Sequence, residues 1–161
     1  MANADRPTGF KPIGSYQTRK YTAGSIIRPG EFVRLSSDGK VDPVAAGETI
    51  LGLAMSLAKA DGDEVQVVVA PNQDYVGQAS GADIDAQTDV GNLCDVLATA
   101  ADSTYDAARM EIDSSTIGTG SGGQLVIIDL QERPDNAYGA QADVIVRVNE
   151  HQLRPADFAG V

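Results

Sequence analysis

The chain has 161 residues and a formal net charge of −11. It therefore has the size of one domain with a substantial core, and its charge argues against a general nucleic-acid binder. Its single cysteine excludes an intramolecular disulfide, and no apolar run approaches the roughly 20 residues of a membrane span. Because the opening MANADRPTGF lacks the apolar stretch of a signal peptide, we expect a protein that is made in a cytoplasm.

Residues 1–24 are predicted to form an extended, basic N-terminal arm. Five basic side chains precede residue 29 against Asp5 alone, whereas the rest of the chain is acidic. The arm shows no helical periodicity, and turn-forming residues punctuate it: Pro7, Gly9, Pro12 and Gly14. Phe10, Ile13 and Tyr16 recur at every third position as apolar anchors. We expect the arm to lie outside the core, across the surface of a neighbouring protein; a frayed terminus is the alternative.

From residue 25 to residue 161 the sequence predicts a single β domain. Short apolar or alternating runs are separated by turn signals about every ten residues, which is typical of small barrels and sandwiches. The clearest runs are 31–35, 49–56, 64–69, 93–97, 110–112, 125–130 and 144–148. The predicted fold class is therefore all-β, a small β-barrel or sandwich (β-tulip-like), with the extended arm at its N-terminus.

Two of these runs, Leu125–Leu130 and Val144–Val148, predict a broad hairpin. The first is apolar at five of its six positions, so we expect both of its faces to be buried. The connection, residues 131–143, is a long polar loop that begins with Arg133-Pro134-Asp135-Asn136. Arg133 has two interpretations: it holds the loop through an internal ion pair, or it belongs to a surface that contacts another protein.

No stretch of the sequence indicates catalysis, and we predict no catalytic residue, no metal site and no cofactor. His151 is the only histidine and lacks a second ligand, so we expect it to hydrogen-bond a turn backbone. The acidic stretches at 61–64 and 83–85 lack the ligand pattern of a calcium loop. The glycine-rich run 118–123 has no following lysine and leads into a strand rather than a helix, unlike a phosphate loop. Cys94 lies in an apolar run, as a buried small hydrophobe would.

Three motifs resemble a known family. The run R-P-D-N-x-x-G-x-x-A-x-x-x-V-x-x-N-x-H-Q, here Arg133 to Gln152, resembles the C-terminal part of a family of small head proteins of tailed bacteriophages. Asp113-Ser114-Ser115-Thr116 and the opening M-A-N-x-D-x-P-x-G-F-x-P-x-G fit the same pattern. Such proteins are similar, in role and β-rich character, to the head decoration (cement) proteins of lambda-like phages. The resemblance implies a virion structural protein.

On this basis we expect a cement protein that stabilises the assembled head by bridging neighbouring shell subunits. Its partners would be the major capsid protein and, by resemblance, two further copies of itself in a homotrimer, with no nucleic acid and no membrane. It would be assembled in the host cytoplasm and lie on the outer capsid surface. The predicted capsid-binding residues are Arg6, Phe10, Lys11, Ile13, Tyr16, Arg19 and Lys20. The predicted subunit or shell contacts are Arg133, Asp135, Asn136, Tyr138 and His151.

Two other classes of function stay open at this point. One is a trimeric β-rich enzyme such as a nucleotide hydrolase, against which stand the missing phosphate site and acid–base pair. The other is a carbohydrate- or receptor-binding virion module. Such sites use exposed aromatic side chains, and this chain has 3 Phe, 5 Tyr and no Trp to supply them.

Overall fold

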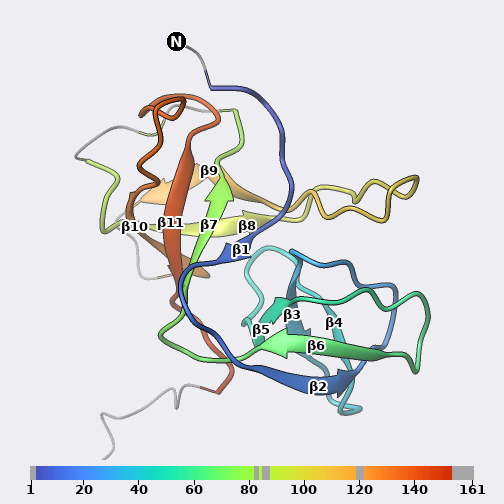
Figure 1. Cartoon of the computed structure of the whole chain (residues 1–161). Helices are drawn as coiled ribbons and strands as arrows, with labels where there is room; N and C mark the ends of the chain where they lie inside the picture. The colour runs from blue at the N-terminus through green and yellow to red at the C-terminus, as the bar shows by residue number, and fades with distance from the viewer. Residues whose placement is uncertain (1–2, 82–83, 85–87, 119–121, 154–161) are drawn as a thin grey trace, which may run out of the picture.

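The computed structural model describes residues 3–81, 84, 88–118 and 122–153, so the C-terminal tail and parts of the 82–87 and 118–123 stretches lie outside it. The described residues form eleven β-strands and no helix, arranged as two antiparallel sheets (Figure 1). The all-β prediction is confirmed. Of the two predicted architectures the sandwich-like one fits, because neither sheet closes into a barrel.

The six-stranded sheet, called here the large sheet, has the order β1-β7-β11-β10-β8-β9. Its strands are β1 (Lys11–Pro12), β7 (Asp74–Gln78), β8 (Leu93–Leu97), β9 (Glu111–Gly118), β10 (Leu125–Leu130) and β11 (Asp143–Val148). The predicted hairpin is β10 and β11, paired from Leu125 opposite Val148 to Leu130 opposite Val144. Its register shifts between Ile127 and Asp129, and Asp129 is exposed, so the expectation that both faces of this run are buried was wrong.

The five-stranded small sheet has the order β2-β6-β5-β3-β4 and lies below the large sheet in Figure 1. Its strands are β2 (Thr18–Thr22), β3 (Phe32–Leu35), β4 (Val41–Pro43), β5 (Gly52–Ala54) and β6 (Glu64–Val68). Along β6, Val65 and Val67 are fully buried while Glu64 and Gln66 are exposed, as the alternation predicts. Val65 and Val67 pack in a core of the small sheet's own, whereas Val68 joins the larger core shared with the other sheet.

An aromatic contact joins the two sheets. The Phe10 and Phe32 rings lie 4.4 Å apart between centroids, and Phe32 meets Tyr75 edge-on at 5.1 Å. Phe10 is 1% exposed, and its ring lies over Gly77 of β7, where a Cβ would overlap ring carbons. Phe10 is therefore a core residue, and its prediction as a capsid-binding residue is corrected: a ring in this position has no surface to offer a partner.

The arm predicted at residues 1–24 is likewise part of the domain from residue 3 onwards. β1 pairs with β7 in the large sheet, and β2 pairs along its whole length with β6 in the small sheet. Prolines and glycines exclude a helix, but they do not prevent a segment from adding a strand to the edge of a sheet, where an absent N–H is tolerated. The boundary predicted near residue 24 thus does not separate two structural units.

Residues near the C-terminal end of the described chain are hydrogen-bonded to the small sheet and to Ile50 beside it. The Ile50 N–H donates to the Glu150 carbonyl at 2.8 Å, and the Gln152 N–H donates to the Ile50 carbonyl at 2.8 Å. The Gln152 side chain accepts from the Leu35 N–H at 2.6 Å and donates to the Leu35 carbonyl at 3.1 Å. Residues 150–152, which follow the large sheet, therefore fasten it to the small one.

The Tyr75 hydroxyl is a weak point in the shared core. Tyr75 is fully buried, and its hydroxyl has no hydrogen-bond partner among the described residues, so burial raises its pKa above the ordinary range. A buried polar group without a partner costs about 1–3 kcal/mol. We expect Tyr75→Phe to raise the free energy of unfolding by about 1 kcal/mol in a denaturant titration. A loss of stability instead would mean that the hydroxyl is hydrogen-bonded in solution.

Candidate contact groove

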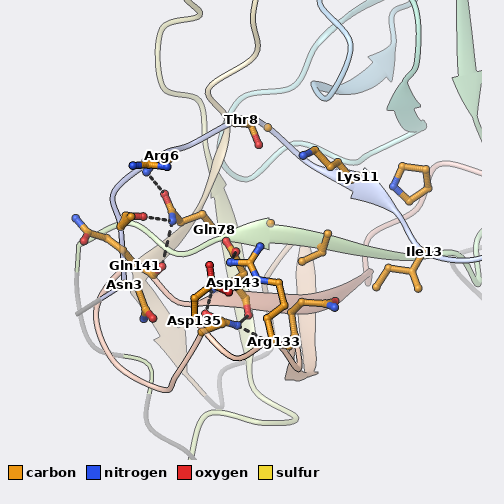
Figure 2. A pocket seen from close by; sticks show the side chains of 17 residues that line it. Asn3, Arg6, Thr8, Lys11, Ile13, Gln78, Arg133, Asp135, Gln141 and Asp143 are labelled. Atoms are coloured by element: carbon orange, nitrogen blue, oxygen red, sulfur yellow. Dashed lines mark hydrogen bonds and ion pairs between the residues drawn. The ribbon is translucent and has the colours of Figure 1, made fainter. Parts of the chain in front are cut away.

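A groove of about 830 Å³ lies where the N-terminal segment (residues 3–13) passes the 131–143 loop, and β7 forms its floor. Figure 2 shows Gln78 reaching toward the N-terminal segment, while Arg133, Asp135 and Asp143 gather on the opposite side. The groove therefore brings together the two stretches of sequence that carry the motifs at either end of the chain. This contact groove is the candidate functional site.

Two amide side chains hold the N-terminal segment in place. The Gln78 side-chain oxygen accepts from the Arg6 N–H at 2.9 Å, and its nitrogen donates to the carbonyls of Ala4 at 2.8 Å and Gln141 at 3.1 Å. Asn3 donates to the carbonyls of Ala137 at 2.8 Å and Ala140 at 2.9 Å. Because an amide offers both donors and an acceptor, Gln78 binds the backbone of the N-terminal segment and of the 131–143 loop at once, and Asn3 binds the loop backbone. The segment is thus bound along its length to the body.

The 131–143 loop is closed by Asn136. Its side-chain nitrogen donates to the carbonyls of Gln131 and Asp143, each at 2.7 Å, and its oxygen accepts from the Asp143 N–H at 2.9 Å. Arg133 adds two ion pairs, with Asp135 at 3.2 Å and with Asp143 at 2.6 Å. Of the two interpretations of Arg133, the structure shows the internal ion pair. Its side chain is nevertheless 47% exposed and still lines the groove.

The groove carries positive charge that its own carboxylates do not neutralise. Asp135 and Asp143 are both engaged by Arg133. Arg6 and Lys11 line the groove, are exposed, and form no ion pair within the described part of the chain. In a chain of net charge −11, this is a local cationic site. Such a site favours an acidic surface or peptide, with groove amides available for hydrogen bonds.

The other predicted site residues divide between the groove and the rest of the surface. Ile13 lines the groove and is 37% exposed, and Tyr16 lies further along the chain and is 45% exposed. Arg19 and Lys20 lie on β2 in the small sheet and do not line the groove, and Lys20 pairs with Glu64 at 2.9 Å. The structure thus separates residues that the sequence analysis grouped on one arm.

Tyr138 and His151 lie outside the groove as well. The Tyr138 hydroxyl donates to Asp129 at 3.5 Å, and burial with the nearby Asp129 charge raises the Tyr138 pKa. His151 is 5% exposed, and its Nδ1 accepts from the Leu153 N–H at 3.1 Å. The expectation that His151 hydrogen-bonds a turn backbone is confirmed, and its prediction as a contact residue is corrected because the ring is buried.

Two residues of the groove, Asn3 and Gln78, were not predicted from the sequence to be functional. Asn3 stood within the opening motif, so a signal existed, but nothing in the sequence showed that its amide reaches the 131–143 loop. Gln78 ends β7 beside Gly77 and carries no motif at all. A buried amide that fastens two distant backbone segments can be found only when the fold is known.

The groove is lined mainly by polar and charged side chains, among them amides, carboxylates, Arg6 and Lys11. Among its lining residues there is no histidine, cysteine or serine, and no cluster of metal-ligating side chains occurs in the part of the chain that the structure describes. The described residues also include no helix long and apolar enough to cross a membrane. The close ring contacts found among them, Phe10–Phe32–Tyr75, are buried and present no face for stacking a sugar.

Comparison with protein-family models and with curated proteins gave no match to this chain.

Proposed function

We propose that this protein is a capsid decoration (cement) protein of a tailed bacteriophage. It binds the outer surface of the assembled head and bridges neighbouring copies of the major capsid protein, without catalysis. The observation that carries the proposal is the contact groove, in which the two terminal motifs of the resemblance meet beside Arg6 and Lys11, two cations with no ion pair among the described residues.

A groove whose walls are already held in place suits a cement function, because less free energy is lost in ordering it on binding. Association costs free energy when loops must be ordered, and a surface that is already held in place avoids much of that cost. Here Asn3, Gln78 and Asn136 hold both walls of the groove through hydrogen bonds to backbone. The contact with one shell subunit can then be modest, because a homotrimer engages several subunits at once and gains affinity from effective concentration.

We restrict the residues proposed to face the shell to those at the contact groove or close to it. Phe10 belongs to the core, and Arg19 and Lys20 lie on the small sheet. The remaining candidates are Arg6, Lys11 and Ile13 at the groove, with Tyr16 beyond it. The proposed partner surface on the shell is acidic, with a small apolar patch for Ile13, and the acidic remainder of the decoration protein faces solvent.

Charge reversal at the groove tests this proposal. The double variant Arg6→Glu and Lys11→Glu should lose affinity for undecorated heads by about tenfold or more, because two attractions become repulsions at a partly desolvated contact. Binding is measured by co-sedimentation with purified heads across a protein titration. Both side chains are exposed and form no ion pairs in the described part of the chain, so the melting temperature should stay unchanged.

The control is the single reversal Lys59→Glu, at an exposed position that does not line the groove, and it is compared with Arg6→Glu and Lys11→Glu made singly as well as together. It should decorate heads like the unmodified protein. Full occupancy of heads by the double variant would rule out the groove as the shell contact. If the unmodified protein binds no head, the proposed cement function is wrong.

A further inference from the structure

The connection between β8 and β9 forms a protruding hairpin, residues 98–110, that extends well away from both sheets (Figure 1). Tyr105 stands at its tip and is 81% exposed, the highest value for any large hydrophobic side chain in the described chain. An exposed aromatic at the end of a projection is the kind of side chain that anchors protein interfaces. Nothing in the groove described above uses it.

The hairpin is structured up to its tip. Asp102 and Ala107 exchange backbone hydrogen bonds at 2.9 and 3.1 Å. The Asp102 carboxylate also accepts from the N–H groups of Thr104 at 2.9 Å and Tyr105 at 3.3 Å. At the base, Ala108 is buried against Gly9 and Gly30, where an added Cβ would lie 2.8 and 3.4 Å from the alanine methyl. Tyr105 is therefore presented with little further loss of backbone freedom on binding.

A hollow with apolar walls, suited to an aromatic side chain such as Tyr105, lies on the small sheet. It has a volume of about 650 Å³ and lies between β2 and the residues that follow β6. Tyr21, Val69 and Pro71 give it apolar walls, and Leu153, 49% exposed, borders it. Tyr21 and Arg19 lie opposite Val65 and Val67 on β6, hence on the face that covers the small-sheet core. This small-sheet hollow thus opens at the end of that core.

The charges of the hairpin and the hollow are opposite. The hairpin's charged side chains are Asp102, Asp106 and Arg109. Asp106 is paired with Arg28 of its own chain at 3.8 Å, whereas Asp102, near the tip, forms no ion pair among the described residues. Arg19 lines the hollow, is exposed, and forms no ion pair in the part of the chain that is described. We propose that the protruding hairpin of one copy docks in the small-sheet hollow of a second copy, with Tyr105 in the hollow and Asp102 facing Arg19.

This contact is head-to-tail, because it joins two different surfaces of the same chain. Head-to-tail contacts close into rings when the rotation between copies allows it. One tyrosine and its flanks bury less than the roughly 1,200–2,000 Å² of a stable interface. A single contact is therefore weak, and a closed ring, in which every copy donates a hairpin and accepts one, stabilises each contact through the others. The inference concerns copies in solution and does not depend on shell binding.

Disulfide trapping tests the contact directly. Two single variants, Thr104→Cys and Ala70→Cys, are mixed under mild oxidation, and covalent dimers are quantified by non-reducing electrophoresis. Thr104 is exposed beside Tyr105, so this variant keeps the tyrosine that is proposed to dock. The native Cys94 is buried, and its pKa is raised to about 12 by that burial, so it should not contribute background. Ala70 lines the hollow, whereas Ala60 is also exposed but lies in the turn between β5 and β6, so Ala60→Cys serves as the matched control.

The proposal requires the Thr104→Cys and Ala70→Cys mixture to form mixed dimers about tenfold faster than the mixture of Thr104→Cys with the Ala60→Cys control. Adding Arg19→Glu to the Ala70→Cys chain should slow trapping, and Arg6→Glu with Lys11→Glu should leave it unchanged. Equal trapping with both partners overturns the proposal. So does trapping that appears only after residues 154–161 are removed, since the chain's own tail would then occupy the hollow. Head co-sedimentation, measured separately, reports on the cement function alone.

Discussion

Replacing Phe10 by alanine is expected to lower the free energy of unfolding by about 3–5 kcal/mol, as for other fully buried phenylalanines. The ring is 1% exposed and packs between Phe32 of the small sheet and Gly77 of the large one. Its removal would leave a cavity at the junction of the sheets and release the segment that carries β1. Urea unfolding followed by tyrosine fluorescence or circular dichroism measures the change.

The matched control is Tyr16→Ala, another aromatic truncation six residues along the same segment. Tyr16 is 45% exposed, so its loss should cost about 0.5 kcal/mol or less. Equal losses of unfolding free energy at the two positions would contradict the placement of Phe10 in the core. The segment would then be an arm that does not pack against the domain.

Gly77 provides a second, sharper check on the same contact. A Cβ at this position would overlap the Phe10 ring, so Gly77→Ala should destabilise the protein on its own. In a protein that already carries Phe10→Ala, the added methyl enters empty space. The double variant should therefore be clearly more stable than the sum of the two single effects predicts, and additive effects would rule out the contact.

The second large effect is expected at Gly52 in β5. A Cβ there would overlap the carbonyl oxygen of Val68 on the neighbouring strand β6, and backbone cannot move aside as a side-chain end can. Gly52→Ala should therefore cost about 3 kcal/mol, near the upper end of overpacking effects, and should lower the melting temperature accordingly. The reason is loss of the close approach between two central strands of the small sheet.

Gly118→Ala is the appropriate comparison for Gly52→Ala. Gly118 also lies in a strand, β9, but among the described residues an added Cβ would meet no atom nearer than the Thr116 carbonyl oxygen at 4.0 Å. It should change stability little. A mild effect at both glycines would mean that β5 and β6 are further apart than the structure places them.

Local alternation predicted much of the fold. The runs at 64–69, 93–97, 125–130 and 144–148 all became strands, because short apolar or alternating runs bounded by turn residues favour strands. The 49–56 run, by contrast, forms only the three-residue strand β5, and Ile50 before it bonds to residues 150–152 instead. Alternation identifies a strand but says little about where its pairing stops.

The N-terminal segment shows why other parts of the fold could not be predicted from the sequence. Its prolines and glycines describe local geometry, but its fate is decided by partners more than 60 residues away, where Lys11 lies opposite Val76. The Phe10 site exists because position 77 lacks a side chain, and no pattern within residues 1–24 reports that. The same holds for the groove: Arg133, Asp135 and Asn136 were predicted as a structured loop, while the Gln78 contact came from the fold alone.

The order in which the ribosome makes this chain conflicts with the order in which its core can close. Phe10 leaves the exit tunnel early, yet Tyr75 and Gly77, which form its binding site, are synthesised much later. The small sheet likewise waits for Glu150 and Gln152 before Ile50 can be paired. Because so many contacts are distant in sequence, we expect slow folding. Phe10 is expected to stay exposed until Gly77 has been made, and the basic residues and prolines around it oppose premature association of that stretch.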